Sequence, residues 1–145
     1  MFGMWWMVAG TLILIVLSIF DIRSQHIPMS GFAVVLIYSI ISLFCSEHGE
    51  YDCMDILMSV IPGIMLIGLS VITEGKIGLG DGILIAELGL GLGIERCIYM
   101  ITGALVLNCI FSGIMLLTHR LRLHSRVPFV PFVAAGMGVV TIVFG

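Results

Sequence analysis

Gly78-Leu79-Gly80-Asp81 lies between two long apolar runs, Ile56 to Thr73 and Ile83 to Leu92. The two glycines give the backbone access to conformations that residues with side chains resist, and they let a neighbouring surface approach closely. The aspartate after them is an ionisable group at the edge of an apolar segment. Placing such a group there costs free energy, so a functional role is the default hypothesis. The simpler interpretation is a glycine-rich turn whose aspartate caps the next helix. A second aspartate, Asp21, at the end of the first apolar run favours the functional interpretation.

The composition is that of an integral membrane protein. Of the 145 residues, 60% are hydrophobic and 10% are charged, and the mean hydropathy is +1.24. A soluble domain carries about 25% charged residues, so this chain has too few to cover a water-exposed surface. We expect one membrane-embedded domain over residues 1–145. The six Lys and Arg residues, without interleaved aromatic residues, predict that nucleic acid is not a partner.

The apolar sequence divides into about six segments, which predict an all-α, polytopic membrane protein with about six transmembrane helices. The runs are continuous rather than alternating, which favours helices over a barrel. A helix needs roughly 20 residues to cross the hydrocarbon core, and the second and fourth segments are short on this measure. The segments are Met4–Phe20, Ser30–Cys45, Ile56–Thr73, Asp81–Ile94, Cys97–Leu117 and Val127–Phe144.

Glycines inside these segments predict close helix packing, because small residues let helix backbones approach each other in a membrane. They are Gly63, Gly68, Gly89, Gly91, Gly93, Gly136 and Gly138.

The basic residues accumulate in the odd-numbered connections between segments. Those connections carry five of the six Lys and Arg residues, whereas the even-numbered ones carry only Arg96. Because Lys and Arg mark the cytoplasmic side of a membrane, we expect the odd connections in the cytoplasm and both termini outside. Asp21, at the end of the first segment, and Asp81, at the start of the fourth, then meet at the same cytoplasmic face.

Two carboxyl groups brought together have a chemistry that neither has alone. Like charges a few ångströms apart do not both ionise easily, so the pair shares one proton. The ionised partner can take a proton from water while the protonated partner hydrogen-bonds a carbonyl oxygen, which is general acid–base hydrolysis without a covalent intermediate. The sequence therefore predicts Asp21 and Asp81 as a catalytic pair.

Neither a metal nor another cofactor is expected. The four cysteines form no CxxC pair, so a thiolate zinc site has no support in the sequence. The histidines on the predicted cytoplasmic side are scattered, which is typical of solvated or headgroup-contacting side chains.

Three motifs follow one another along the chain. They are Asp21 followed by Ile27-Pro28, the GxGD motif at Gly78–Asp81, and a Pro-Phe-x-Pro-Phe element at Pro128–Phe132. In this order they resemble the type IV prepilin peptidases, membrane aspartyl proteases of the prepilin and preflagellin type, over almost the whole chain. The resemblance implies that Asp21 and Asp81 are the catalytic pair.

The resemblance also implies a substrate and a place in the cell. The family removes the basic leader from prepilin-like precursors of type IV pilus and secretion systems. The cut falls at a glycine before a hydrophobic helix, at the cytoplasmic face of the cell membrane. The implied partners are this precursor and membrane lipid. Large members carry a cytoplasmic domain with two CxxC pairs and also methylate the new N-terminus, so this chain resembles the short, protease-only branch.

Two departures from the family pattern concern how substrate or lipid is held. The residue after Ile-Pro is often Asn or Asp in the family and is Met29 here, and the lysine that often follows GxGD is replaced by Gly82-Ile83. Lys76 is thus the only basic residue near Asp81 in the sequence. The supporting residues that we expect are Gly78, Gly80 and Pro28 for the loop, and Lys76 and Arg23 for substrate or headgroup contacts.

Two alternatives use the same aspartates. A presenilin-like protease also has GxGD, but its Tyr-Asp pair would be Tyr51-Asp52, in the acidic connection at the opposite face. A non-catalytic transporter or assembly protein would bind a proton or cation at Asp21 and Asp81 and would need carboxylates deeper in the bilayer. Glu87 is the one candidate, and we expect it to face other helices and to be hydrogen-bonded there.

Overall fold

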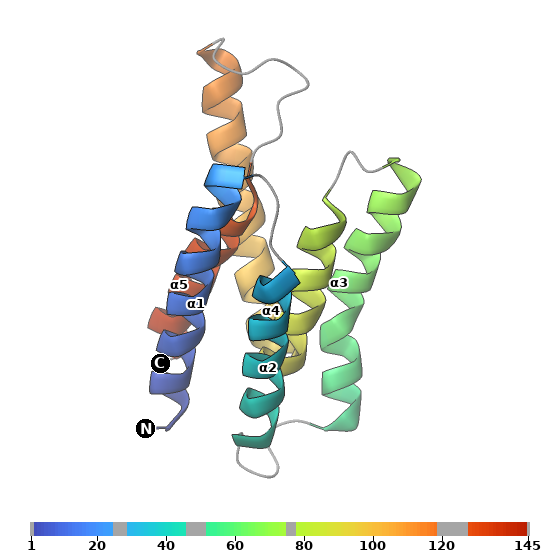
Figure 1. Ribbon diagram of the computed structural model, residues 1–145, viewed down its shortest axis with the longest axis vertical. Coiled ribbons are helices and arrows are strands. Elements are labelled where there is room, and N and C mark those ends of the chain that lie inside the picture. Colours follow the sequence, from blue (N-terminus) through green and yellow to red (C-terminus); the bar gives the residue numbers. More distant parts are fainter. Residues whose placement is uncertain (1, 25–28, 46–51, 75–77, 119–127, 145) are drawn as a thin grey trace.

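Five α-helices make up the computed structural model, which describes residues 2–24, 29–45, 52–74, 78–118 and 128–144. No strand occurs within these ranges, so the predicted all-α class is confirmed for the described chain. The helices are α1 (Phe2–Ser24), α2 (Met29–Cys45), α3 (Cys53–Ile72), α4 (Leu79–Leu117) and α5 (Val130–Phe144) (Figure 1).

Three stretches are long and apolar enough to cross a membrane: Trp5–Arg23, Cys53–Ile72 and Leu79–Leu117. The helices α2 and α5 are apolar but shorter, with 17 and 15 residues. At 1.5 Å per residue, a helix of this length falls a few ångströms short of a typical hydrocarbon core of about 30 Å. The count of about six crossings stays a prediction.

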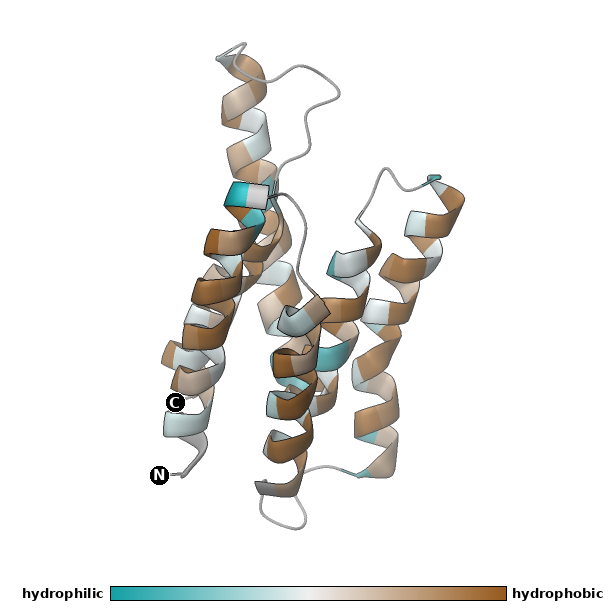
Figure 2. Cartoon of the chain, viewed as in Figure 1, coloured by the Kyte–Doolittle hydropathy of each residue, from teal (hydrophilic) through white to brown (hydrophobic). Residues whose placement is uncertain are grey.

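The outside of the helices is apolar, as it would be against lipid. Hydrophobic residues line the helices along most of their length (Figure 2). Large side chains such as Met29, Leu117 and Ile142 are 82–89% exposed. A soluble monomer rarely exposes extended apolar surface, so this pattern agrees with the membrane character that the composition predicts.

The helix α4 breaks at Gly93. The φ of 76° and ψ of 170° at this residue lie in a region that is essentially open to glycine alone. The Sγ atom of Cys97 lies 3.5 Å from the ideal Cβ position of Gly89. In a straight helix, two residues with this separation in the sequence would be about 12 Å apart along the axis. The chain therefore reverses direction at the break (Figure 1). The sequence predicts two segments here, and the break falls where the first of them ends.

Glycines bring α3 and the first half of α4 into close contact. A Cβ at Gly63 would meet the backbone of Ala86, and a Cβ at Gly89 would meet the carbonyl oxygen of Ser59. The packing role predicted for these two glycines is confirmed. It is wrong for Gly68, because nothing lies within 4 Å of its ideal Cβ position.

Close packing also joins α5 to the second half of α4. A Cβ at Gly136 would meet the carbonyl oxygen of Met100 and would lie 3.2 Å from the backbone nitrogen of Ala104. Of the other glycines for which the sequence predicts packing, Gly91 lies against Ser39 of α2, whereas Gly138 has nothing within 4 Å. The buried core forms where α1, α4 and α5 meet. Its fully buried members include Leu14, Leu84, Leu88, Met100, Val130, Val133, Met137 and Val140.

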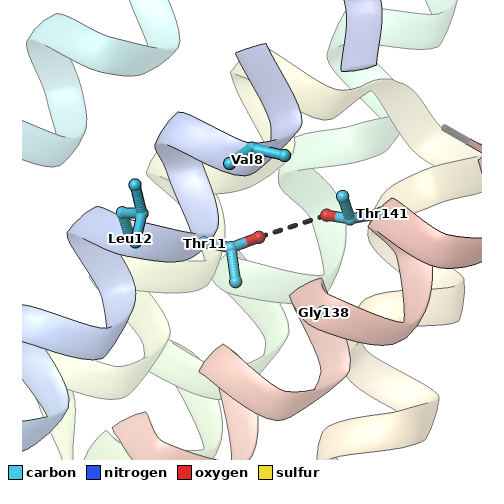
Figure 3. Close-up of a pocket in the computed structure, with 5 residues that line it drawn as sticks. All are labelled: Val8, Thr11, Leu12, Gly138 and Thr141. Carbon is cyan, nitrogen blue, oxygen red and sulfur yellow. Dashed lines mark hydrogen bonds between the residues drawn. The ribbon is translucent and has the colours of Figure 1, made fainter. Parts of the chain in front are cut away.

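The helices α1 and α5 are joined by a hydrogen bond between the hydroxyl groups of Thr11 and Thr141, at 3.1 Å (Figure 3). An open pocket of about 150 Å³ lies beside this bond, lined by Val8, Thr11, Leu12, Gly138 and Thr141. One of the two hydroxyl groups donates in this bond, and the other is left to donate to a carbonyl oxygen of its own helix, that of Met7 for Thr11 or of Met137 for Thr141. The pocket therefore presents an almost wholly apolar surface and lacks an ionisable group, so it is a poor candidate for hydrolytic chemistry.

Candidate functional site

The helix ends that carry the two predicted aspartates lie at one end of the bundle. The helix α1 ends there and α4 and α5 begin there, whereas the N- and C-termini lie at the other end (Figure 1). The sequence predicts this convergence from the alternating direction of its segments. The site is best described one side chain at a time.

Asp21 lies in the last turn of α1 and is buried, with 6% of its surface exposed. Its Oδ2 atom accepts a hydrogen bond from the backbone N–H of Val130, at 3.2 Å. Val130 is the first residue of α5, so the carboxyl group of Asp21 caps a helix that lies far along the chain. A carboxylate is favoured there because the first N–H groups of a helix lack partners within the helix.

Asp81 lies in the first turn of α4, whose N-cap is Gly78. The backbone N–H of Asp81 donates to the carbonyl oxygen of Gly78, at 3.1 Å. The N-cap of this helix is Gly78 and not Asp81, so the simpler interpretation of this aspartate as the helix cap is wrong. Asp81 is partly buried rather than fully exposed.

Gly78 leaves the space that the carboxyl group of Asp81 occupies. An ideal Cβ at Gly78 would lie 2.7 Å from Oδ2 of Asp81. The φ of −64° and ψ of 119° at Gly78 are open to any residue, so the unusual backbone conformation expected here is not found. The close approach expected of this glycine is confirmed. Gly80 lies within the first turn of the same helix.

The two carboxyl groups lie within electrostatic reach of each other, since the charge of Asp21 acts on Asp81. Side chains from the end of the first apolar run and the start of the fourth therefore share one site. Two carboxyl groups that interact in this way can hold one proton between them.

The sequence also predicts Arg23, Pro28 and Lys76 as supporting residues of the site. Arg23 is exposed in the last turn of α1, beyond Asp21. Pro28 and Lys76 lie outside the described residues. In the described part of the chain, no group of three or more His, Cys, Asp or Glu side chains could hold a metal ion. The expected absence of a metal stays a prediction.

Glu87 differs from its prediction. Its Oε2 atom is buried and has no hydrogen-bond partner in the structure, although we expected this side chain to be hydrogen-bonded to other helices. The Oγ atom of Ser39 and the Oδ1 atom of Asn108 are buried without a partner in the same way.

The sequence does not predict the partner of Asp21. The Pro-Phe-x-Pro-Phe element is visible in the sequence, but the backbone N–H of Val130 has no sequence signal of its own. The two prolines do indicate that a helix begins within this element, because proline is favoured in the first turn of a helix. The helix accordingly begins at Val130, inside the element, and not at Val127 as predicted.

Comparison with known proteins gives one match. The model of the type IV leader peptidase family matches residues 8–117. Neither the curated proteins nor the solved structures give a significant match. The matched residues are more than half of the chain and include Asp21 and Gly78–Asp81, whereas Pro128–Phe132 lies beyond them. The chain belongs to the type IV leader peptidase family.

Proposed function

We propose that the protein is an aspartic-type endopeptidase that removes the basic leader from prepilin-like precursors at the cytoplasmic face of the membrane. Membership of a leader peptidase family supports proteolysis of such a precursor. The observation that carries the proposal is the meeting of Asp21 and Asp81 within electrostatic reach at one end of an apolar bundle. In this proposal they form the catalytic dyad.

The chemistry proposed for the dyad is direct attack of water on the scissile peptide bond. One carboxylate removes a proton from the water while the protonated carboxyl group of its partner hydrogen-bonds the carbonyl oxygen. Two positioned carboxyl groups suffice for this reaction, and no covalent intermediate is needed. Because the pair titrates as a unit, activity should depend on pH through the pair and not through one residue.

The position of the site suits a substrate with a charged leader and an apolar helix. The leader would stay in the aqueous phase, and the helix would lie beside the apolar helices of the peptidase. Exposed Arg23 would contact lipid headgroups or the precursor near the cut. Lys76 is assigned the same role, and Pro28 and Gly80 support the loops, from the sequence alone.

A cleavage assay tests the proposed function. The purified protein, in vesicles, is incubated with a pilin-type precursor, and the products are measured by mass spectrometry. We expect a shortened product that has lost the whole leader, and no product when the glycine at the cut is replaced by a bulky residue. A precursor that stays intact under conditions in which the peptidase is folded would contradict the proposal.

The membrane face of the site can be tested by labelling cysteines in intact cells. Cys53 is exposed at the start of α3, and Thr118 is exposed at the end of α4, near the end of the bundle that carries the aspartates. A membrane-impermeant maleimide should label Cys53 from outside. In a Cys53→Ser background, it should label Thr118→Cys only after permeabilisation. Labelling of both positions from the same side would show that the charge distribution misplaced the site.

Replacing Gly78 tests the space that it leaves for Asp81. We expect Gly78→Ala to lower kcat by about 10- to 100-fold, because the new Cβ displaces a carboxyl group that must be held to within about 1 Å. Gly113→Ala is the matched control, since nothing lies within 4 Å of the ideal Cβ of this glycine in the same helix. Wild-type kcat for Gly78→Ala would show that the observed position of Asp81 is not the reactive one.

A further inference from the structure

Among the residues that the structure describes, a backbone donor holds one of the two carboxyl groups. Asp21 accepts the hydrogen bond from Val130, whereas no described residue donates a hydrogen bond to the carboxyl group of Asp81. Asp81 lies in the first turn of α4, where the helix dipole favours negative charge, whereas Asp21 lies between the end of α1 and the start of α5, whose dipoles act on it in opposite directions. The dipoles therefore do not favour Asp21 as the ionised member, and the hydrogen bond from Val130 is the feature that does.

The first turn of α5 leaves the N–H of Val130 free to point at Asp21. The carbonyl oxygen of Phe129 accepts hydrogen bonds from the N–H groups of Phe132 and Val133, which makes Phe129 the N-cap. Pro131 has no N–H to offer. The two prolines of this element thus leave few backbone donors, and the N–H of Val130 is the one directed at Asp21.

We propose that the backbone N–H of Val130 is a positioning group that makes Asp21 the ionised, water-activating member of the dyad and leaves the shared proton on Asp81. A hydrogen bond to a charged acceptor is about twice as strong as one between neutral groups, so it selects the aspartate that stays ionised. This inference rests on the proposed function, and it adds an assignment of roles that the family match does not give.

The assignment fixes the course of the proton transfers. Asp21 takes a proton from water as the water oxygen bonds to the carbonyl carbon, and Asp81 gives its proton to the carbonyl oxygen. The resulting gem-diol returns a proton to Asp81, and Asp21 passes its proton to the leaving nitrogen as the C–N bond breaks. The products are a carboxylic acid and an amine, and the dyad returns to its starting protonation state.

Few other ionisable groups of the described helices are available to face Asp21. The described residues of α5 include none, and α2 offers Tyr38, whose hydroxyl donates to the carbonyl oxygen of Trp6. Asp81 acts on the site from α4, and Glu87 lies further along the same helix. Arg23 is exposed on the helix of Asp21 itself. A pH effect caused by the N–H of Val130 should therefore appear in the titration of the dyad.

Val130→Pro removes this one donor at a position that suits proline, because proline is favoured at the first residue of a helix. We expect the acidic limb of the pH profile of kcat/KM to move up by about one pH unit, the size expected for losing a hydrogen bond to a charged group. Val130→Ala keeps the N–H and should keep the limb in place, even if lost packing lowers the rate. Cys53→Pro, at the exposed first residue of α3, should leave both rate and limb unchanged.

An unmoved acidic limb in active Val130→Pro would overturn the assignment. If Val130→Pro does not accumulate, carboxyl-carbon NMR of aspartate-labelled wild-type protein decides, with each resonance assigned by its loss in Asp21→Asn or Asp81→Asn. We expect Asp21 ionised and Asp81 protonated in the resting enzyme, and the reverse would overturn the assignment. Failure of the proposed function looks different, because the folded wild-type protein would then leave the precursor intact, or Asp21→Asn would still cleave it, whatever Val130→Pro does.

Discussion

Asp21→Asn and Asp81→Asn are each expected to reduce cleavage of a prepilin-like precursor by at least about 100-fold, the scale of general acid–base catalysis. Asparagine keeps the size and one carbonyl oxygen of aspartate, but it can neither take up nor release a proton in this role. Neither partner can be spared, because one activates water and the other polarises the scissile carbonyl. The measurement is the initial rate of product formation with equal amounts of each variant in vesicles.

The structure indicates that Asp21→Asn keeps the fold. The side-chain oxygen of asparagine can still accept the hydrogen bond from Val130, and asparagine is as good a helix cap as aspartate. Loss of activity with an unchanged circular dichroism spectrum would therefore report on chemistry and not on unfolding. We expect Asp81→Asn to keep the fold as well, since no described residue donates a hydrogen bond to this carboxyl group.

The double variant separates a dyad from two independent sites. Residues that act as a unit show strongly non-additive losses, so Asp21→Asn/Asp81→Asn should be scarcely slower than either single variant. Glu87→Gln is the matched control, because it neutralises a carboxylate in the same helix whose buried Oε2 has no partner. We expect it to keep most activity. Near wild-type cleavage by Asp21→Asn would show that the aspartates are not a catalytic dyad.

The sequence predicts the helices well because apolar length decides them in a membrane. Continuous runs of the required length predict the helices, and the observed ends differ from the predicted ones by a few residues. Hydropathy is less informative about where a chain turns within apolar sequence. Gly89, Gly91 and Gly93 look alike in the sequence, yet two of them pack against other helices and only Gly93 has a positive φ.

The candidate site is predicted in part. The meeting of Asp21 and Asp81 follows from the direction of the segments, since alternate helix ends lie at the same end of a bundle. The donor to Asp21 does not follow, because a backbone N–H is common to almost every residue and only the path of the chain aims it. For Gly78, the sequence predicts a close approach but not the group that approaches. That group is the carboxyl group of Asp81, three residues further along the chain.

Gly63→Ala is expected to destabilise the protein strongly. Its new Cβ would lie 2.6 Å from the Cα atom of Ala86, and a backbone atom cannot rotate away as a side chain can. The helices α3 and α4 would have to separate, and overpacking of this kind costs about 1–3 kcal/mol. We expect a lower Tm in detergent and, because Asp81 lies in the helix that moves, a lower cleavage rate as well.

Gly68→Ala is the matched control, in the same helix and with the same added methyl group. Nothing lies within 4 Å of the ideal Cβ of Gly68, and alanine is favoured over glycine in a helix by about 1 kcal/mol. Its Tm should equal or exceed that of the wild type, so the two variants should move Tm in opposite directions. Equal Tm values for the two variants would contradict the close α3–α4 packing, because the substitutions differ only in the surroundings of the new methyl group.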